Sequence, residues 1–208
     1  LLRSPLLRRR IAAYQLLGLR GGPDSQSGLL KALAGERSAL GRLVVLSLIA
    51  REPSTPDVPA LIECLEARRD RRWKRELAVL APLAPRLKPY FEERGIPAGD
   101  AGLGLYLMSA RAAPTAADLE ALESLATSRD DPIGEEAAEI LALRAPADRF
   151  LRAFRDRPEP RFRAPGARLL GRLLEPDGLA SLDPWFADPA LSAAGSAAAA
   201  AVLEHHPG

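Results

Sequence analysis

The same pattern of apolar positions returns along the chain about every 31 residues. In each copy a turn, often containing proline, precedes apolar residues about two, six and nine positions further on, which is the spacing of a helix with one buried face. In the fifth copy these positions hold Gly134, Ala138 and Leu141. The copies begin near residues 5, 37, 71, 101, 132, 160 and 189. The pattern predicts a helix at the start of every copy.

A second set of apolar stripes lies between these helices, at residues 29–33, 58–65, 87–91, 119–125, 150–154 and 179–186. Glycine and proline separate the stripes from the first set. Asp24, Asp57, Thr115 and Asp148 stand near several starts, where a side-chain oxygen accepts a hydrogen bond from a free N–H group. No segment alternates with period two long enough for a strand. The sequence therefore predicts an all-α chain of about twelve to fourteen helices in antiparallel pairs.

The repeated unit resembles the HEAT repeat, in the short form of phycobiliprotein-lyase-like proteins. Such repeats read Asp-Pro-x-Val-Arg-x-x-Ala-x-x-x-Leu. The segments that carry the resemblance are Ser4-Pro5-Leu6-Leu7-Arg8, Asp131-Pro132-Ile133-Gly134-Glu135 and Pro160-Arg161-Phe162-Arg163. The chain departs from the pattern at Glu135 and Ser192, which replace the Arg, and at Arg71 and Ala101, which replace the Pro.

The resemblance implies one repeat domain over residues 1–208, wound as a right-handed α-α superhelix. It also implies an Asp–Arg ladder between adjacent repeats and places the Arg-bearing helices on the concave side. Because the chain begins at Leu1 and its first and last copies begin and end abruptly, we expect it to be part of a longer array.

Composition narrows the class of protein. The 208 residues are 47% hydrophobic and 27% charged, which excludes an intrinsically disordered chain. No apolar run approaches the length of about 18 residues that a membrane span needs. The single cysteine excludes an internal disulfide and favours a reducing compartment, so we expect a cytoplasmic protein, although a targeting signal could precede this segment.

No residue pattern points to catalysis, and the sequence predicts no catalytic residue, no cofactor and no metal site. Cys64 lies on an apolar stripe, where a small buried hydrophobe is favoured over a nucleophile. His205 and His206 lie beyond the last periodic residue and are interpreted as a solvated tail. The acidic residues at 135, 136 and 139 favour the positive end of a helix dipole, with a cation or a basic partner as the alternative.

Arginines carry the functional hypothesis. Residues 1–50 hold eight basic and two acidic side chains, whereas residues 101–150 hold four basic and nine acidic ones, within a net charge of +2. Arginines that fall off the apolar positions are expected to face the concave groove or its rim, where the planar guanidinium suits carboxylates. These candidate partner-binding residues are Arg9, Arg10, Arg42, Arg72, Arg75, Arg161, Arg168 and Arg172.

The sequence thus favours a non-catalytic scaffold that binds another protein, with an acidic segment, in its concave groove. Two alternatives stay open: an enzyme or chaperone like the bilin lyases, and a nucleic-acid-binding HEAT-like solenoid. Nucleic acid is disfavoured because the net charge is only +2 and aromatic residues rarely accompany the arginines. No pocket motif favours a small-molecule ligand.

Overall fold

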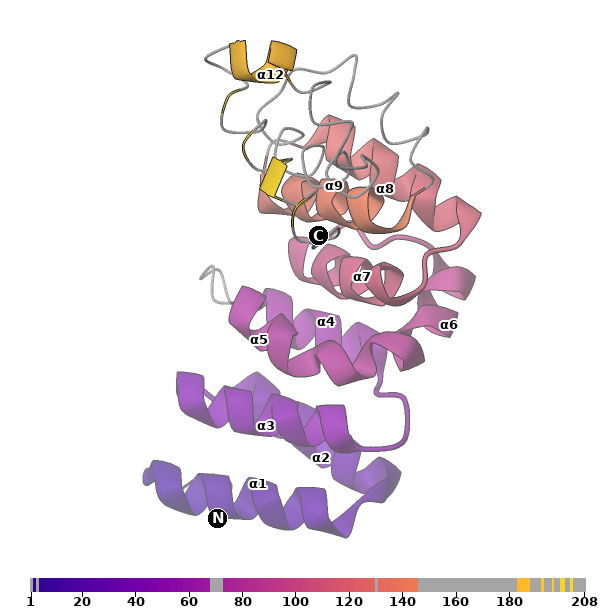
Figure 1. Cartoon of the computed structure of the whole chain (residues 1–208). Helices are drawn as coiled ribbons and strands as arrows, with labels where there is room; N and C mark the ends of the chain where they lie inside the picture. The colour runs from indigo at the N-terminus through magenta and orange to yellow at the C-terminus, as the bar shows by residue number, and fades with distance from the viewer. Residues whose placement is uncertain are drawn as a thin grey trace. The chain divides into compact units, whose positions relative to one another are not determined.

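Every regular element in the described part of the computed structural model is helical. The description covers residues 2, 4–67, 73–129, 131–145 and 183–187, with single residues at 192, 196, 199, 200 and 203. The elements are α1 (Leu7–Arg20), α2 (Gly22–Gly35), α3 (Ala39–Arg51), α4 (Val58–Glu66), α5 (Trp73–Leu80), the 3₁₀ turn η1 (Ala81–Leu83), α6 (Ala84–Arg94), α7 (Asp100–Ala112), α8 (Ala116–Ser128), α9 (Pro132–Arg144) and α12 (Asp183–Ala187) (Figure 1). The prediction of an all-α chain is confirmed for these residues.

The helix starts follow the predicted repeat. Helices α1, α3, α5, α7 and α9 begin at residues 7, 39, 73, 100 and 132, close to the first five predicted copy starts. Helices α2, α4, α6 and α8 cover the first four stripes of the second set, residues 29–33, 58–65, 87–91 and 119–125. The copies that begin near 160 and 189, together with the side chains of Trp73 and Trp185, lie outside the described residues.

Side-chain caps fix several of these starts. The Asp57 carboxylate accepts a hydrogen bond from Ala60 N at the start of α4. Thr115 and Asp118 form a reciprocal capping box at the start of α8. Asp24, by contrast, lies inside the first turn of α2, because the chain enters that helix through Gly21, whose φ is 66°. Only glycine adopts that left-handed conformation at little cost.

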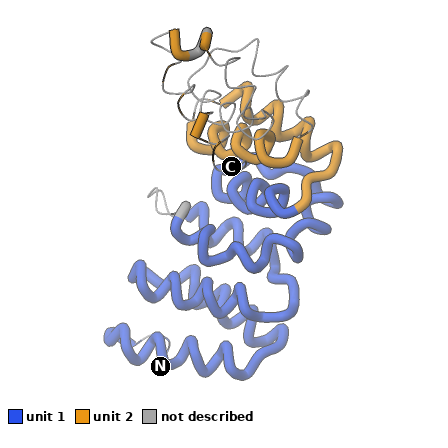
Figure 2. Tube along the Cα trace, viewed as in Figure 1, with its two compact units in different colours: residues 1–112 blue, residues 113–208 orange. Residues whose placement is uncertain are grey.

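The chain divides into two compact units, residues 1–112 and 113–208 (Figure 2). In the first unit, α1, α3, α5 and α7 follow one another as neighbours in one layer, and α2 and α4 are neighbours in a second layer (Figure 1). In the second unit, α8 packs against α9. Consecutive helices therefore alternate between layers in the first unit, as expected for stacked helix pairs.

The core of the first unit lies between its two layers. Leu29 and Leu33 of α2 are fully buried, and so are Leu46 and Ile49 of α3 and Leu61 of α4. Burying a leucine or isoleucine side chain stabilises the fold by about 1.5–3 kcal/mol each, so this shared apolar layer is the main force that holds the pairs together.

In the second unit, close packing at the start of α9 requires a residue without a Cβ atom. Asp131 caps α9 by accepting hydrogen bonds from Ile133 N at 2.9 Å and Gly134 N at 3.1 Å. A Cβ atom added to Gly134 would collide with the backbone carbonyl oxygen of Arg129, which cannot move away as a flexible side chain would. Glycine is therefore required at residue 134 by the lack of room for a Cβ atom, although its helix propensity is low.

We predict that Gly134→Ala destabilises the protein by about 1–3 kcal/mol, the usual cost of overpacking. The matched control is Gly35→Ala at the end of α2, where an added Cβ meets nothing within 4 Å. That change should be neutral or stabilising, because alanine favours helix by up to about 1 kcal/mol. Urea unfolding of both variants measures the difference. Equal effects of the two substitutions would contradict the packing argument.

Candidate functional site

The described arginines fall into two groups, one buried inside the fold and one exposed. Of the predicted partner-binding residues, Arg9 and Arg75 are exposed, Arg10 is partly buried and Arg42 is buried, with 2% of its surface exposed. The remaining predicted residues, Arg72, Arg161, Arg168 and Arg172, lie outside the described residues.

Arg42 holds four helices together. Its Nε and Nη2 atoms donate hydrogen bonds to the two Glu76 carboxylate oxygens of α5, at 2.7 and 2.9 Å. Its Nη1 donates to Leu33 O at 3.0 Å, and Nη2 also donates to Cys64 O at 3.1 Å. These two carbonyls belong to the last turns of α2 and α4, where helices leave C=O groups without a partner. Arg42 is therefore a structural residue and is removed from the partner-binding set.

Arg10 makes a similar link between α1 and the chain that follows α2. Its Nε and Nη2 atoms donate to the Glu36 carboxylate at 2.9 and 3.1 Å. Tyr14 Oη donates to the same carboxylate at 2.6 Å, and the Ser38 N–H group donates to it at 2.7 Å. Burial alone would raise the pKa of Glu36, but these hydrogen bonds outweigh burial and lower it to about 2. Burial and the bond to Glu36 raise the pKa of Tyr14 to about 12.

Arg86 of α6 caps a third helix, and sequence reasoning missed it. Its guanidinium donates to Ala50 O at 2.6 Å and to Ser54 O at 2.9 Å, and also to Glu52 O. Ala50 lies in the last turn of α3, so this arginine satisfies carbonyls at a helix end in the same way as Arg42 does.

The buried arginines share a position in the repeat that the apolar pattern had left out. Arg10, Arg42 and Glu76 each lie five residues after their copy start, and Tyr106 and Ala137 occupy the same place in the next two copies. Arg42, Glu76, Tyr106 and Ala137 are all buried, and Arg10 is partly so. An alignment of the copies by their start, without regard to residue type, could have identified the position five residues later as an inward-facing one.

Three exposed arginines, Arg8, Arg51 and Arg75, lie on the outer side of the layer that contains α1, α3 and α5. On α3, Leu48 turns toward α1, where it would touch a Cβ atom at Gly18, while Val45, Leu46 and Ile49 are buried. The opposite side of α3 is the exposed one. We call this surface the odd-helix face. Its residues are Arg8, Ile11, Leu40, Val44, Ser47, Arg51, Arg75 and Ala78.

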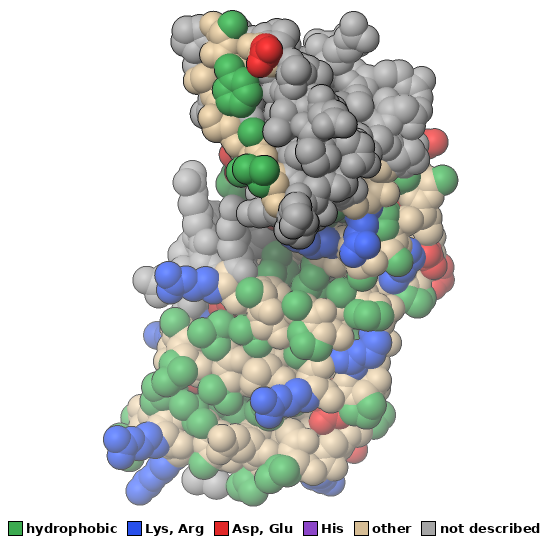
Figure 3. Space-filling model, viewed as in Figure 1, with side chains coloured by type: hydrophobic (Ala, Val, Ile, Leu, Met, Phe, Trp, Pro, Cys, Tyr) green, Lys and Arg blue, Asp and Glu red, His purple; other side chains and the backbone are tan. Residues whose placement is uncertain are grey.

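The odd-helix face combines apolar and cationic side chains and has no exposed carboxylate on α1, α3 or α5. Glu76, the acidic residue of these three helices, is buried against Arg42. The neighbouring Glu36 and Glu52 are buried as well, at 4% and 5% exposure. Figure 3, which views this layer, shows hydrophobic and basic side chains over these helices and few acidic ones. The surface therefore has a positive potential over an apolar base.

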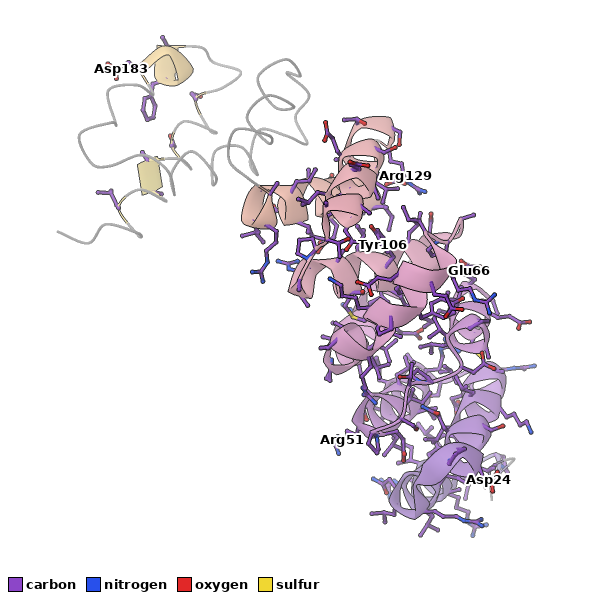
Figure 4. The ribbon with its side chains drawn as sticks, turned by 90° about the vertical axis from the view of Figure 1, so that its right-hand side faces the viewer. Asp24, Arg51, Glu66, Tyr106, Arg129 and Asp183 are labelled. Atoms are coloured by element: carbon purple, nitrogen blue, oxygen red, sulfur yellow. The ribbon has the colours of Figure 1, made fainter. Side chains whose placement is uncertain are left out.

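Two exposed acidic residues of the first unit lie on the side opposite to Arg51. Arg51 points outward from one side of the unit, whereas Asp24 of α2 and Glu66 of α4 lie on the opposite side (Figure 4). Arg8, Arg51 and Arg75 have no carboxylate within ion-pair distance in the described part of the chain. Their guanidinium groups are therefore available to a carboxylate from a partner.

The hollow between α2 and α4 and the thiol of Cys64 give weaker evidence of a functional site than the odd-helix face does. A hollow of about 480 Å³ lies between α2 and α4 and is lined by residues that include Gln26, Lys31 and Cys64. Cys64 is half-buried, its thiol donates to Leu30 O at 3.7 Å, and burial raises the pKa of that thiol, which disfavours the reactive thiolate. Over the residues described, no three His, Cys, Asp or Glu side chains come together as a metal site, and no helix has the length and apolarity to cross a bilayer.

The acidic residues at the start of α9 have a structural role in part. Asp131 caps the helix and pairs with Arg129, whose hydrogen bond, together with those from Gly134 N and Ile133 N, lowers the pKa of the carboxyl.

Comparison with protein-family models, with curated proteins and with solved structures found no match.

Replacing the Arg42 guanidinium should destabilise the helices that it joins. We predict that Arg42→Met costs about 3–5 kcal/mol, because Glu76 is left buried without its partner. The control Arg75→Met, at an exposed position of α5, should change stability by less than about 0.5 kcal/mol. Adding Glu76→Leu to Arg42→Met should restore part of the loss, since no unpaired charge remains. Urea denaturation tests this, and an Arg42→Met cost no larger than that of Arg75→Met would refute it.

The Arg10–Glu36–Tyr14 cluster predicts how stability varies with pH. The pKa of Glu36 is lowered from 4.5 to about 2, so its contribution is complete above pH 4.5 and is lost as the pH falls toward 2. The pKa of Tyr14 is raised from 10.0 to about 12, so its contribution is complete below pH 10 and is lost as the pH rises toward 12.

Unfolding curves collected across both ranges test the assignment. Glu36→Gln should remove the acid decline that Glu36 causes and also reduce the alkaline one, because the carboxylate of Glu36 contributes to the raised pKa of Tyr14. Tyr14→Phe should remove the alkaline decline that Tyr14 causes and reduce the acid one, because the hydroxyl of Tyr14 contributes to the lowered pKa of Glu36. If Glu36→Gln keeps the acid decline of the wild type, the carboxylate is not the group responsible.

Proposed function

We propose that the chain is a HEAT-like α-solenoid, wound as a right-handed superhelix, that acts as a non-catalytic scaffold and binds an acidic segment of a partner protein. The observation that carries this proposal is the odd-helix face, which combines exposed Arg8, Arg51 and Arg75 with apolar side chains and has no exposed carboxylate on the same helices. Apolar contacts at the centre with charges at the rim are the usual anatomy of a protein interface.

Three features support the solenoid. The helices of the first unit alternate between two layers, their starts recur at a nearly constant interval, and the buried Arg42–Glu76 pair joins one copy to the next. This pair uses Glu where the family ladder uses Asp. A stack of such units provides a long continuous face, which suits an extended or helical protein segment.

The odd-helix face favours protein over nucleic acid as the partner. Binding of single strands relies on aromatic side chains on which bases stack. On α1 and α3 the aromatic residue is Tyr14, which is buried with its hydroxyl bound to Glu36, and the side chain of Trp73 on α5 lies outside the described residues. The face also contains Leu40 and Val44, so it offers apolar contact area as well as charge.

Charge reversal on the odd-helix face tests the proposal. Immobilised wild-type chain and the Arg51→Glu/Arg75→Glu variant are compared for proteins captured from a lysate, with identification by mass spectrometry. We expect at least one acidic protein whose affinity for the variant is about tenfold or more weaker, because rim charges contribute through screened attraction. Both positions are exposed, so the melting temperature should change little.

The matched control is Lys31→Glu/Arg94→Glu, which changes the net charge equally on the even-numbered helices α2 and α6. The proposal requires that this control keep the captured protein, and that duplex DNA and single-stranded RNA fail to displace it at physiological salt. Loss of capture in the control to the same extent would show a general charge effect. Displacement by nucleic acid would favour the alternative class of partner.

A further inference from the structure

A second exposed apolar surface lies on α1, on the side that faces away from the rest of the first unit. Leu16 is 61% exposed and Leu19 is 83% exposed, and Ala12 is exposed beside them. The three residues are spaced four and three positions apart, which places them on one side of a helix. We call this surface the end face.

The contacts of α1 show that the end face is opposite its packed side. Leu17 lies against α2, where it would touch a Cβ atom at Gly28, and Gly18 lies against Leu48 of α3. Ala13 and Tyr14 are buried between them. At about 100° per residue, Leu16 and Leu19 then point away from both neighbouring helices. Helix α1 is accordingly at one end of the layer (Figure 1).

The charged side chains beside the end face indicate which kind of partner this surface can bind. Arg9 and Arg20 are exposed along one border of the stripe, and neither has a carboxylate within ion-pair distance among the described residues. They are eleven positions apart, which is about 16 Å along the helix axis or three turns. Helix α1 contains no acidic residue. A second copy packed through the same face would therefore bring arginines against arginines without a neutralising group, which is unfavourable.

We propose that the end face binds an amphipathic helix of a partner protein, with an apolar stripe and two carboxylates about three turns apart beside it. The apolar stripe covers Leu16 and Leu19 at the spacing of 8–10 Å usual between packed helices. The carboxylates take bidentate hydrogen bonds from Arg9 and Arg20. Arg8 of the odd-helix face lies one turn before Ala12 and so borders this surface. Leu16, Leu19, Arg9 and Arg20 are not part of the odd-helix face, so the inference does not depend on the proposed function.

A displayed library of helical peptides provides the probe. Each peptide carries leucines at the spacing of one apolar stripe, and its flanking positions are randomised among Glu, Lys, Gln and Ser. Selection against the wild-type chain should enrich Glu at flanking positions about three turns apart. Affinities of the selected peptides are then measured by fluorescence anisotropy at low and physiological salt.

Two variants and a control locate the binding surface. Leu16→Ser/Leu19→Ser should weaken binding of the selected peptides by about tenfold or more, as expected for central apolar contacts. Arg9→Glu/Arg20→Glu should reverse the preference from Glu to Lys. Leu40→Ser changes a leucine of similar exposure, 56%, on the odd-helix face and should leave the affinity within about twofold.

The proposal is overturned by three results. One is a selection that yields no binders or shows no preference for Glu. Another is loss of binding with Leu40→Ser in place of Leu16→Ser/Leu19→Ser. The third is a dimer of the wild-type chain in light scattering that becomes a monomer with Leu16→Ser/Leu19→Ser, since the occupant would then be a second copy.

Discussion

The guanidinium group of Arg42 joins four helices of the first unit, α2, α3, α4 and α5, inside the apolar core that holds the helix pairs together. Helices in stacked pairs end next to one another, and each end leaves carbonyl oxygens that the helix itself cannot satisfy. One buried side chain serves the ends of α2 and α4 and binds the Glu76 carboxylate of α5 as well. A planar group with five donors can do this, whereas the ammonium of a lysine offers no matching fork.

This use of charge inside the fold explains the charge on its surface. Glu36, Glu52 and Glu76 are drawn into the interior, where arginines or backbone N–H groups bind them. The exposed arginines of α1, α3 and α5 are then left without nearby carboxylates. The odd-helix face thus owes its positive potential to where the acidic residues are buried, although the chain as a whole carries a net charge of only +2.

The sequence predicted the helices well because their starts coincide with prolines, caps and apolar spacing, as at Asp57 and Thr115. It did not distinguish a buried arginine from an exposed one. Arg42 and Arg51 both fall off the apolar stripe of α3, yet the first is buried and the second is exposed. The difference lies in partners on other helices, 9 to 34 residues away along the chain, and spacing within one helix cannot reveal them.

NMR spectra can measure how fast the Nε–H proton of each arginine exchanges with solvent. This rate distinguishes arginines that are bound to carboxylates inside the fold from those that are exposed. We expect slow exchange for Arg42 and Arg10, whose Nε–H groups are bound to Glu76 and Glu36, and fast exchange for Arg8, Arg51 and Arg75. An Arg42 Nε–H group that exchanges as fast as that of Arg51 would contradict this expectation.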